Sequence, residues 1–176
     1  TLTRMEDGVP EWLRFDYSIS NKWKVRVGLL SLGAFVSIFS GTFVSTTPGA
    51  NFGCGVDGLP DSWPLCNGKI VDSVEDVVAQ SQIIHRWFVG LMLVALIFAS
   101  YSISNEKSGD NTLRNWIWGS TFLFFVNTSI GAIYVLSWDL EEGFFEFLSL
   151  VHLMMASLTF VTMAISWIGC SIAEDG

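Results

Sequence analysis

The chain has 176 residues, of which 51% are hydrophobic and only 15% are charged, and its mean hydropathy is positive. This balance is typical of a membrane protein and leaves no room for a separate soluble domain. The formal net charge is -8, and we expect no nucleic-acid partner for so acidic a chain.

Four apolar stretches are each long enough to cross a hydrocarbon core of roughly 30 Å as a helix that rises about 1.5 Å per residue. None of them contains Asp or Glu, and their only formal charge is Arg86. The predicted spans are residues 27–47, 83–104, 115–138 and 147–173. We therefore predict an all-α membrane protein whose transmembrane domain covers residues 27–173.

The segment before the first span, residues 1–26, mixes charged with aromatic residues, which suits a segment lying along the cytoplasmic headgroups. A signal peptide is not expected, because this segment is mostly polar. Small residues then recur every four positions in the first span and predict the close approach of a neighbouring helix. They are Gly33, Ser37, Gly41 and Ser45.

The distribution of basic residues predicts the orientation of the spans. Lys and Arg gather before the first span and recur in the second loop, so both regions should be cytoplasmic. The connections near residues 105–114 and 139–146 are short, which forces consecutive helices to be antiparallel. We predict an up-down-up-down four-helix bundle in the cell membrane, with both termini cytoplasmic and the loop 48–80 on the extracytoplasmic side.

The first loop contains Cys54 and Cys66, with Gly, Pro and Asp residues between them. Because that side of the membrane is oxidising, we predict a disulfide between the two cysteines. A redox-active pair that exchanges with a quinone is the alternative, although neither cysteine lies in a Cys-x-x-Cys pattern. Cys170 lies near the other end of the fourth span and is expected to be a packing residue.

The third span carries Asn127, Gly131 and Tyr134 at helical spacing, so a face of polar and small residues should point inward. A buried amide needs a hydrogen-bond partner, which another helix or a bound ligand can supply.

His85 and His152 are the two histidines of the chain, and both lie inside apolar spans. An intramembrane histidine is a functional-site hypothesis by default, because a ring nitrogen in hydrocarbon is costly unless it binds something. His85 follows Asp76 by nine positions and His152 follows Glu146 by six. At about 1.5 Å per residue, the two rings should lie at nearly the same depth.

Two imidazoles at one depth on facing helices can supply both axial ligands of a heme, and Arg86 is placed to pair with a propionate. Two alternatives stay open. The histidines can be hydrogen-bonded between helices without a cofactor, or they can bind a metal ion alone, for which no Cys or carboxylate is expected at that depth.

Several runs of residues resemble heme A synthases. Gly41-Thr-Phe-Val-Ser-Thr-Thr-Pro-Gly49 and Asp61-Ser-Trp-Pro-Leu-Cys-Asn-Gly68 are similar to the first helix and first outer loop of that family. Gln82-Ile-Ile-His85-Arg86 is similar to the start of its second helix, and Val151-His152-Leu153 to its fourth. The third helix is matched by residues 127–131, and the likeness covers about residues 28–172.

Heme A synthases are usually eight-helix proteins made of two four-helix halves, and this chain corresponds to one half. The resemblance implies that His85 and His152 are axial ligands and that Cys54 and Cys66 form the outer-loop disulfide. It also implies pairing, either as a homodimer or with another subunit of a larger membrane complex.

Gln82 departs from the family, since it stands where the catalytic half has a glutamate. An amide does not serve as a general acid or base. Two functions therefore remain open: oxidation of heme O to heme A, or a non-catalytic subunit that binds heme b, or only lipid, and scaffolds a membrane oxidase or monooxygenase complex.

Overall fold

The computed structural model describes residues 10–71, 77–107, 111–138 and 142–173, and over these residues it is helical without a β-strand. Each of its four long helices is long and apolar enough to span a membrane, as predicted. They are α1 (Tyr17–Thr46), α2 (Val77–Ser104), α3 (Thr112–Leu136) and α4 (Glu146–Ile172), accompanied by the short 3-10 helices η1 (Glu11–Leu13) and η2 (Ala50–Phe52).

Helix α1 begins at Tyr17, well before the predicted start of the first span, so residues 17–26 of the predicted interfacial segment are its first turns. The cause is helical spacing, because Ile19, Trp23 and Val27 recur every four residues and all three are buried. Residues 1–9 of that segment lie outside the described residues.

The start of α1 is capped by Asp16, whose carboxylate accepts hydrogen bonds from the Ser18 hydroxyl and from the Ile19 backbone N–H. Both hydrogen bonds lower the pKa of the Asp16 carboxyl group, and the one from Ser18 has the larger effect. The other long helices begin and end within a few residues of the predicted limits, except that α2 begins at Val77.

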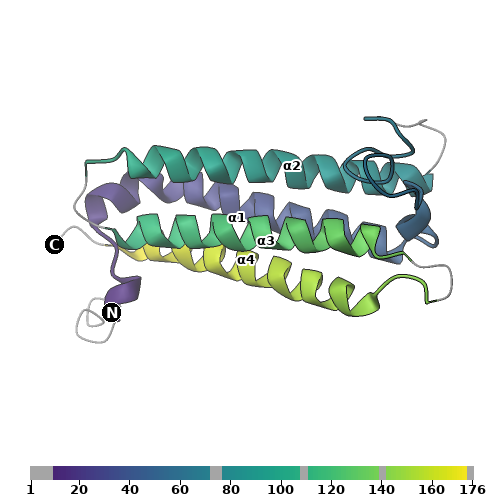
Figure 1. Ribbon diagram of the computed structural model, residues 1–176. Coiled ribbons are helices and arrows are strands. Elements are labelled where there is room, and N and C mark those ends of the chain that lie inside the picture. The colour runs from purple at the N-terminus through teal and green to yellow at the C-terminus, as the bar shows by residue number, and fades with distance from the viewer. Residues whose placement is uncertain (1–9, 72–76, 108–110, 139–141, 174–176) are drawn as a thin grey trace.

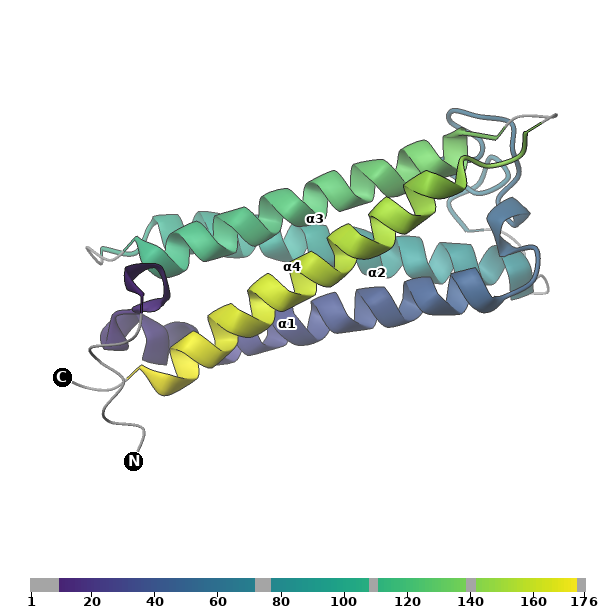
Figure 2. The ribbon, with the colours of Figure 1, turned by 90° about the horizontal axis from the view of Figure 1, so that it is seen from below.

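The four helices form a bundle in which consecutive helices run in opposite directions (Figure 1). Helix α1 contacts α2 and α4, and α3 contacts the same two helices. Helix α4 crosses the bundle obliquely. It begins beside the end of α3 and ends close to the beginning of α1 (Figure 2). We call the end where α1 begins and α4 finishes the terminal end, and the opposite end, with the cysteine loop, the disulfide end.

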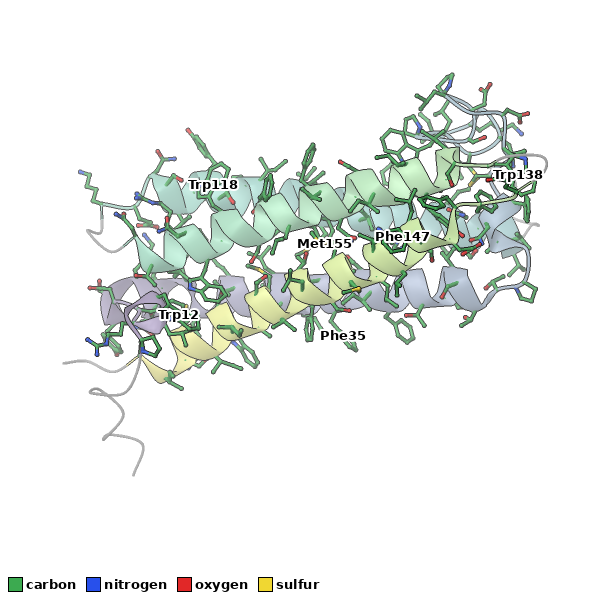
Figure 3. The ribbon with its side chains drawn as sticks, turned by 60° about the horizontal axis from the view of Figure 1, so that its bottom comes forward. Trp12, Phe35, Trp118, Trp138, Phe147 and Met155 are labelled. Carbon is green, nitrogen blue, oxygen red and sulfur yellow. A yellow bond between two sulfur atoms is a disulfide. The ribbon has the colours of Figure 1, made fainter. Side chains whose placement is uncertain are left out.

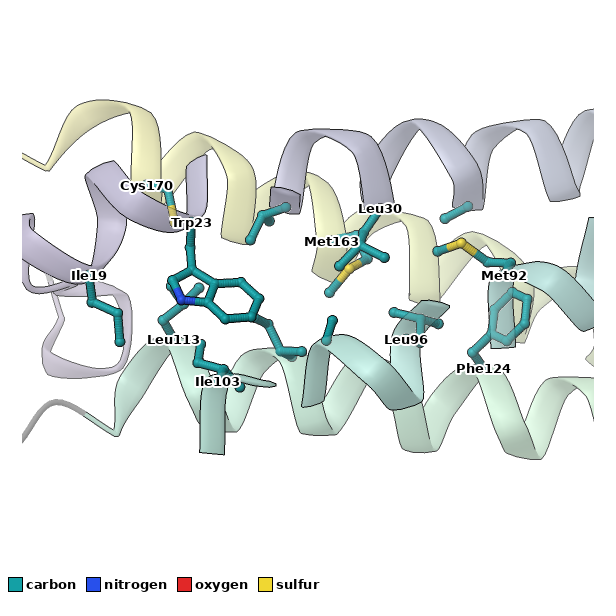
Figure 4. Packing of buried hydrophobic residues seen from close by; sticks show 14 residues of the cluster. Ile19, Trp23, Leu30, Met92, Leu96, Ile103, Leu113, Phe124, Met163 and Cys170 are labelled. Carbon is teal, nitrogen blue, oxygen red and sulfur yellow. The ribbon is translucent and has the colours of Figure 1, made fainter. Parts of the chain in front are cut away.

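The half of the bundle at the terminal end is packed with large apolar side chains from all four helices (Figure 4). Trp23, Leu96 and Met163 lie in this core and are at most 1% exposed. The indole N–H of Trp23 donates to Glu106, which also forms a salt bridge of 2.8 Å with Lys22. Many large apolar side chains outside the core, such as Phe35 and Trp118, point outward, as expected for a surface that contacts lipid (Figure 3).

At the disulfide end the predicted bond between Cys54 and Cys66 is present, and the two residues are 1% and 2% exposed. Both cysteines pack against Ala79 and Ile83 at the start of α2. The loop is therefore fixed to the beginning of the helix that carries His85.

Candidate functional site

A cavity of about 750 Å³ occupies the half of the bundle at the disulfide end. All four long helices and the cysteine loop line it. Ala34, Phe124 and Thr159 close its deep side toward the core, whereas Trp63, Leu65 and Tyr134 lie at its outer side. The volume lies within the range of roughly 300–1,000 Å³ that is usual for binding sites of small molecules and cofactors.

The two histidines meet in this cavity. His85 comes from α2 and His152 from α4, and their ring centres lie 6.5 Å apart with the ring planes at 89°. The sequence predicted the two rings at one depth, although Asp76, from which the depth of His85 is counted, lies outside the described residues. We refer to His85 and His152 as the histidine pair.

Each imidazole is held through Nδ1. His152 Nδ1 lies 2.9 Å from the backbone oxygen of Asn127, and since a carbonyl only accepts, this nitrogen carries the proton. His85 Nδ1 lies 2.9 Å from the hydroxyl oxygen of Ser40. That hydroxyl donates its single hydrogen to the Ser37 carbonyl, so it accepts from His85 Nδ1–H.

In the neutral imidazole, a proton on Nδ1 leaves Nε2 unprotonated, and Nε2 is then the nitrogen that binds metals. Within the parts of the chain that the structure describes, neither Nε2 has a hydrogen-bond partner. The structure thus brings together two anchored imidazoles whose lone pairs are free.

A glycine on the preceding helix makes room for each imidazole. A Cβ atom added at Gly41 of α1 would lie 3.1 Å from Cε1 of His85, and one at Gly131 of α3 would lie 2.8 Å from Cε1 of His152. The sequence placed Gly41 in a stripe of small residues for close helix packing and Gly131 on an inward face of the third span. Their role is to seat the histidine pair.

Arg86 lies at the cavity wall beside the loop. Its Nη1 donates to the Leu65 carbonyl oxygen at 2.6 Å, whereas Nη2 is buried and has no hydrogen-bond partner among the described residues. A buried guanidinium nitrogen without an acceptor is costly, so the site is suited to a ligand that brings an anionic or acceptor group there.

Gln82 is buried and has a structural contact. Its Nε2 donates to the backbone oxygen of Ala50 at 2.9 Å, which ties α2 to η2. No Asp or Glu lines the cavity among the described residues. Gln82 therefore serves here as a link between helix α2 and the loop.

Tyr134 links three segments at the outer side of the cavity. Its hydroxyl accepts from Asn51 Nδ2 at 3.1 Å and lies 3.3 Å from both carboxylate oxygens of Glu146, to which it donates. The Tyr134 and Trp138 rings also contact Phe144. Sequence reasoning placed Tyr134 on an inward face but gave no sign of its partners.

The donor set fits a heme better than a lone metal ion. The ring centres lie 6.5 Å apart, so His85 and His152 are the residues that would hold a heme iron in this cavity. No group of three or more His, Cys, Asp or Glu side chains suited to a metal ion occurs in the described ranges. The orphaned Nη2 of Arg86 fits a ligand with an acidic edge.

The surroundings of the disulfide suit a structural bond rather than a reactive one. Both cysteines are almost fully buried between the loop and α2, and attack by an external thiolate needs access to a sulfur. The thiol of Cys170 is buried in the core at the terminal end.

Comparison of the chain with family models, with curated proteins and with solved structures gave no match. The assignment of the site therefore rests on its own geometry and chemistry.

Proposed function

We propose that this chain is an integral membrane protein of the cell membrane that holds a heme b between His85 and His152. The observation that carries the proposal is the pair of imidazoles anchored through Nδ1, with both Nε2 atoms free in one cavity. Arg86 Nη2 supplies the contact for a propionate. When bound, the heme would supply one-electron redox chemistry, while the chain holds and orients it.

The proposed orientation has both termini in the cytoplasm and the loop 48–80 outside. The basic residues before and between the spans support this orientation, and it places the histidine pair near the extracytoplasmic face. The predicted partners are lipids together with a second copy of the chain or a larger membrane oxidase or monooxygenase complex.

A non-catalytic role is favoured over oxidation of heme O to heme A. Gln82 is engaged by Ala50, and no carboxylate lines the described cavity to move a proton. The second candidate, heme O oxidation, is favoured by the likeness of the Trp-Pro-Leu-Cys loop and the histidine pair to heme A synthases.

Titration of the detergent-solubilised chain with heme b tests the binding proposal. We expect one heme per chain, and a loss of affinity of at least about tenfold in His85→Ala and in His152→Ala. Ser129→Ala is the control, because Ser129 lies on α3 outside the cavity and donates to its own helix. Full heme content in both histidine variants would refute axial ligation.

Production of the chain together with heme O separates the two functions. We expect the extracted heme to contain no formyl derivative, and the Gln82→Glu variant tests whether a carboxylate at this position is what is missing. Formyl heme extracted from the unmodified chain would replace the non-catalytic function with the enzymatic one.

A further inference from the structure

Three side-chain oxygens gather around one point in the cysteine loop. They are Asn67 Oδ1, Asp57 Oδ2 and Ser62 Oγ, which lie 2.9, 3.2 and 3.7 Å from the position that a Cβ atom on Gly55 would take. We call them the loop oxygen cluster. None of these residues lines the cavity of the histidine pair, so the cluster is separate from the proposed heme site.

The hydroxyl group of Ser62 is the part of the cluster that indicates a ligand. Ser62 is 1% exposed, and its Oγ is buried without a hydrogen-bond partner among the described residues. A buried hydroxyl group without a partner costs free energy, so native proteins seldom retain one unless a bound group satisfies it. Asp57 and Asn67 are exposed, which leaves the cluster accessible from solvent.

The backbone of the loop holds these oxygens in place and does not neutralise them. The backbone N–H groups of the residues in and beside the cluster donate to carbonyl oxygens of the loop itself; they belong to Gly55, Ser62 and Asn67. The side-chain Nδ2 of Asn67 donates to the Gly53 carbonyl oxygen at 3.1 Å, and its Oδ1 is the atom that faces Gly55. The disulfide closes the same loop, so the cluster is formed before a ligand binds.

We propose that Asp57, Ser62 and Asn67 form a binding site for Ca²⁺ in the cysteine loop. A hard cation with oxygen ligands in flexible geometry matches a carboxylate, an amide oxygen and a hydroxyl group, and water completes its coordination. Zn²⁺ prefers nitrogen and sulfur ligands, and Mg²⁺ needs a near-ideal octahedron, so this set favours Ca²⁺. The site does not depend on heme binding.

Terbium luminescence measures binding directly, because Tb³⁺ takes the same oxygen ligands as Ca²⁺ and is excited through a nearby tryptophan, here Trp63 beside Ser62. The chain in an uncharged detergent is loaded with TbCl3, and CaCl2 or MgCl2 then displaces the bound ion. We expect a Kd for Ca²⁺ of about 0.1–1 mM, as in extracellular calcium modules, and weaker displacement by Mg²⁺.

Two substitutions of equal charge test the assignment of the carboxylate. Asp57→Asn should weaken Ca²⁺ binding by at least about tenfold, because it removes the charged ligand. Glu142→Gln is the control, since it removes a charge from the loop before α4 at the same end of the bundle and should leave the affinity unchanged. Equal affinities in the two variants, or no displacement of Tb³⁺ by Ca²⁺ from the unmodified chain, would overturn the proposal.

The Ser62→Ala variant separates a ligand from a structural residue. Without Ca²⁺ its melting temperature should equal or exceed that of the unmodified chain, because the variant lacks the unsatisfied hydroxyl group. The rise in melting temperature on addition of CaCl2 should be smaller than in the unmodified chain. An equal rise in both proteins would remove Ser62 from the site. Heme titration of the same preparations is expected to be unaffected, so the two proposals are tested separately.

Discussion

The two halves of the bundle use the same four helices in different ways. Toward the terminal end, the inward positions of α1 carry large apolar side chains such as Trp23 and Leu30, and these pack into a closed core. Toward the disulfide end, the same face of α1 continues with Ala34, Ser37 and Gly41, and the bundle contains the cavity. The change in side-chain size along one helix face separates the packed core from the cavity.

The same change occurs along α3 and α4. On α3 the inward residues pass from Ile117 and Phe124 to Asn127 and Gly131, and on α4 they pass from Met163 to His152. Stability and binding are therefore expected to respond to mutations in different halves of the molecule.

The largest effect on stability is expected from Leu96→Ala in the core. Leu96 is 0% exposed, and truncation of a buried leucine costs about 2–5 kcal/mol when the space does not collapse. The comparison variant is Leu93→Ala, three residues earlier on α2, because Leu93 lines the cavity and is only partly buried where it packs against the core, so its truncation should cost less. The free energy of unfolding of both variants is measured in mixed micelles. Equal losses of stability would contradict the difference in packing between the two halves.

Replacement of Cys54 and Cys66 by serine is expected to cost roughly 2–4 kcal/mol, because the bond closes a short loop at the end that lacks the main core. The loop also carries Leu65, which holds Arg86, so heme affinity should fall together with stability. Heme titration of the double serine variant measures the second effect. Unchanged affinity would show that the loop does not position Arg86.

Gly131→Ala should weaken heme binding by about tenfold, since the new methyl group displaces the His152 ring. Gly119→Ala on the same helix is the control, because a Cβ there meets nothing within 4 Å. Alanine is favoured over glycine in a helix by about 0.5–1 kcal/mol, so the control should be slightly stabilised. Equal heme affinity in the two variants would contradict the seating of the ring by glycine.

The smallest effect on stability is expected from Glu106, at the terminal end. The hydrogen bond from Lys22, followed by that from Trp23, lowers the pKa of this carboxyl group below its ordinary value of 4.5. A lowered folded-state pKa stabilises the fold above the ordinary value, and the contribution is lost as the pH falls through the folded-state pKa.

Comparison of the unmodified chain with Glu106→Gln, between about pH 6 and pH 3, measures this contribution. The difference in melting temperature should be small at the higher pH and should vanish at the lower pH. The lowered pKa of Asp16 affects both proteins equally and cancels. A difference that does not depend on pH would show that the carboxylate charge is not involved.

Much of the fold was predictable from hydropathy and spacing. Apolar runs located the four helices, and the matched depth of His85 and His152 anticipated that the two rings share one cavity. The beginning of α1 was not predicted, because Lys22, Lys24 and Arg26 lower the mean hydropathy of turns whose inner face is apolar.

The sequence did not predict the hydrogen-bond partners of the residues in the site. Ser40 lies one position away from the stripe of small residues, and its contact with His85 depends on the rotation of α1 against α2. The bond from Arg86 to Leu65 depends on the folding of the loop, which spacing along the chain does not determine. Hydropathy gives depth in the membrane, whereas these contacts depend on the angle around each helix.

The most direct test of heme binding is the electron paramagnetic resonance spectrum of the ferric protein reconstituted with heme b. Axial ligation by His85 and His152 predicts a low-spin signal in the unmodified chain and a high-spin signal in His152→Ala. A high-spin signal in the unmodified chain, or an unchanged low-spin signal after loss of either histidine, would contradict the account.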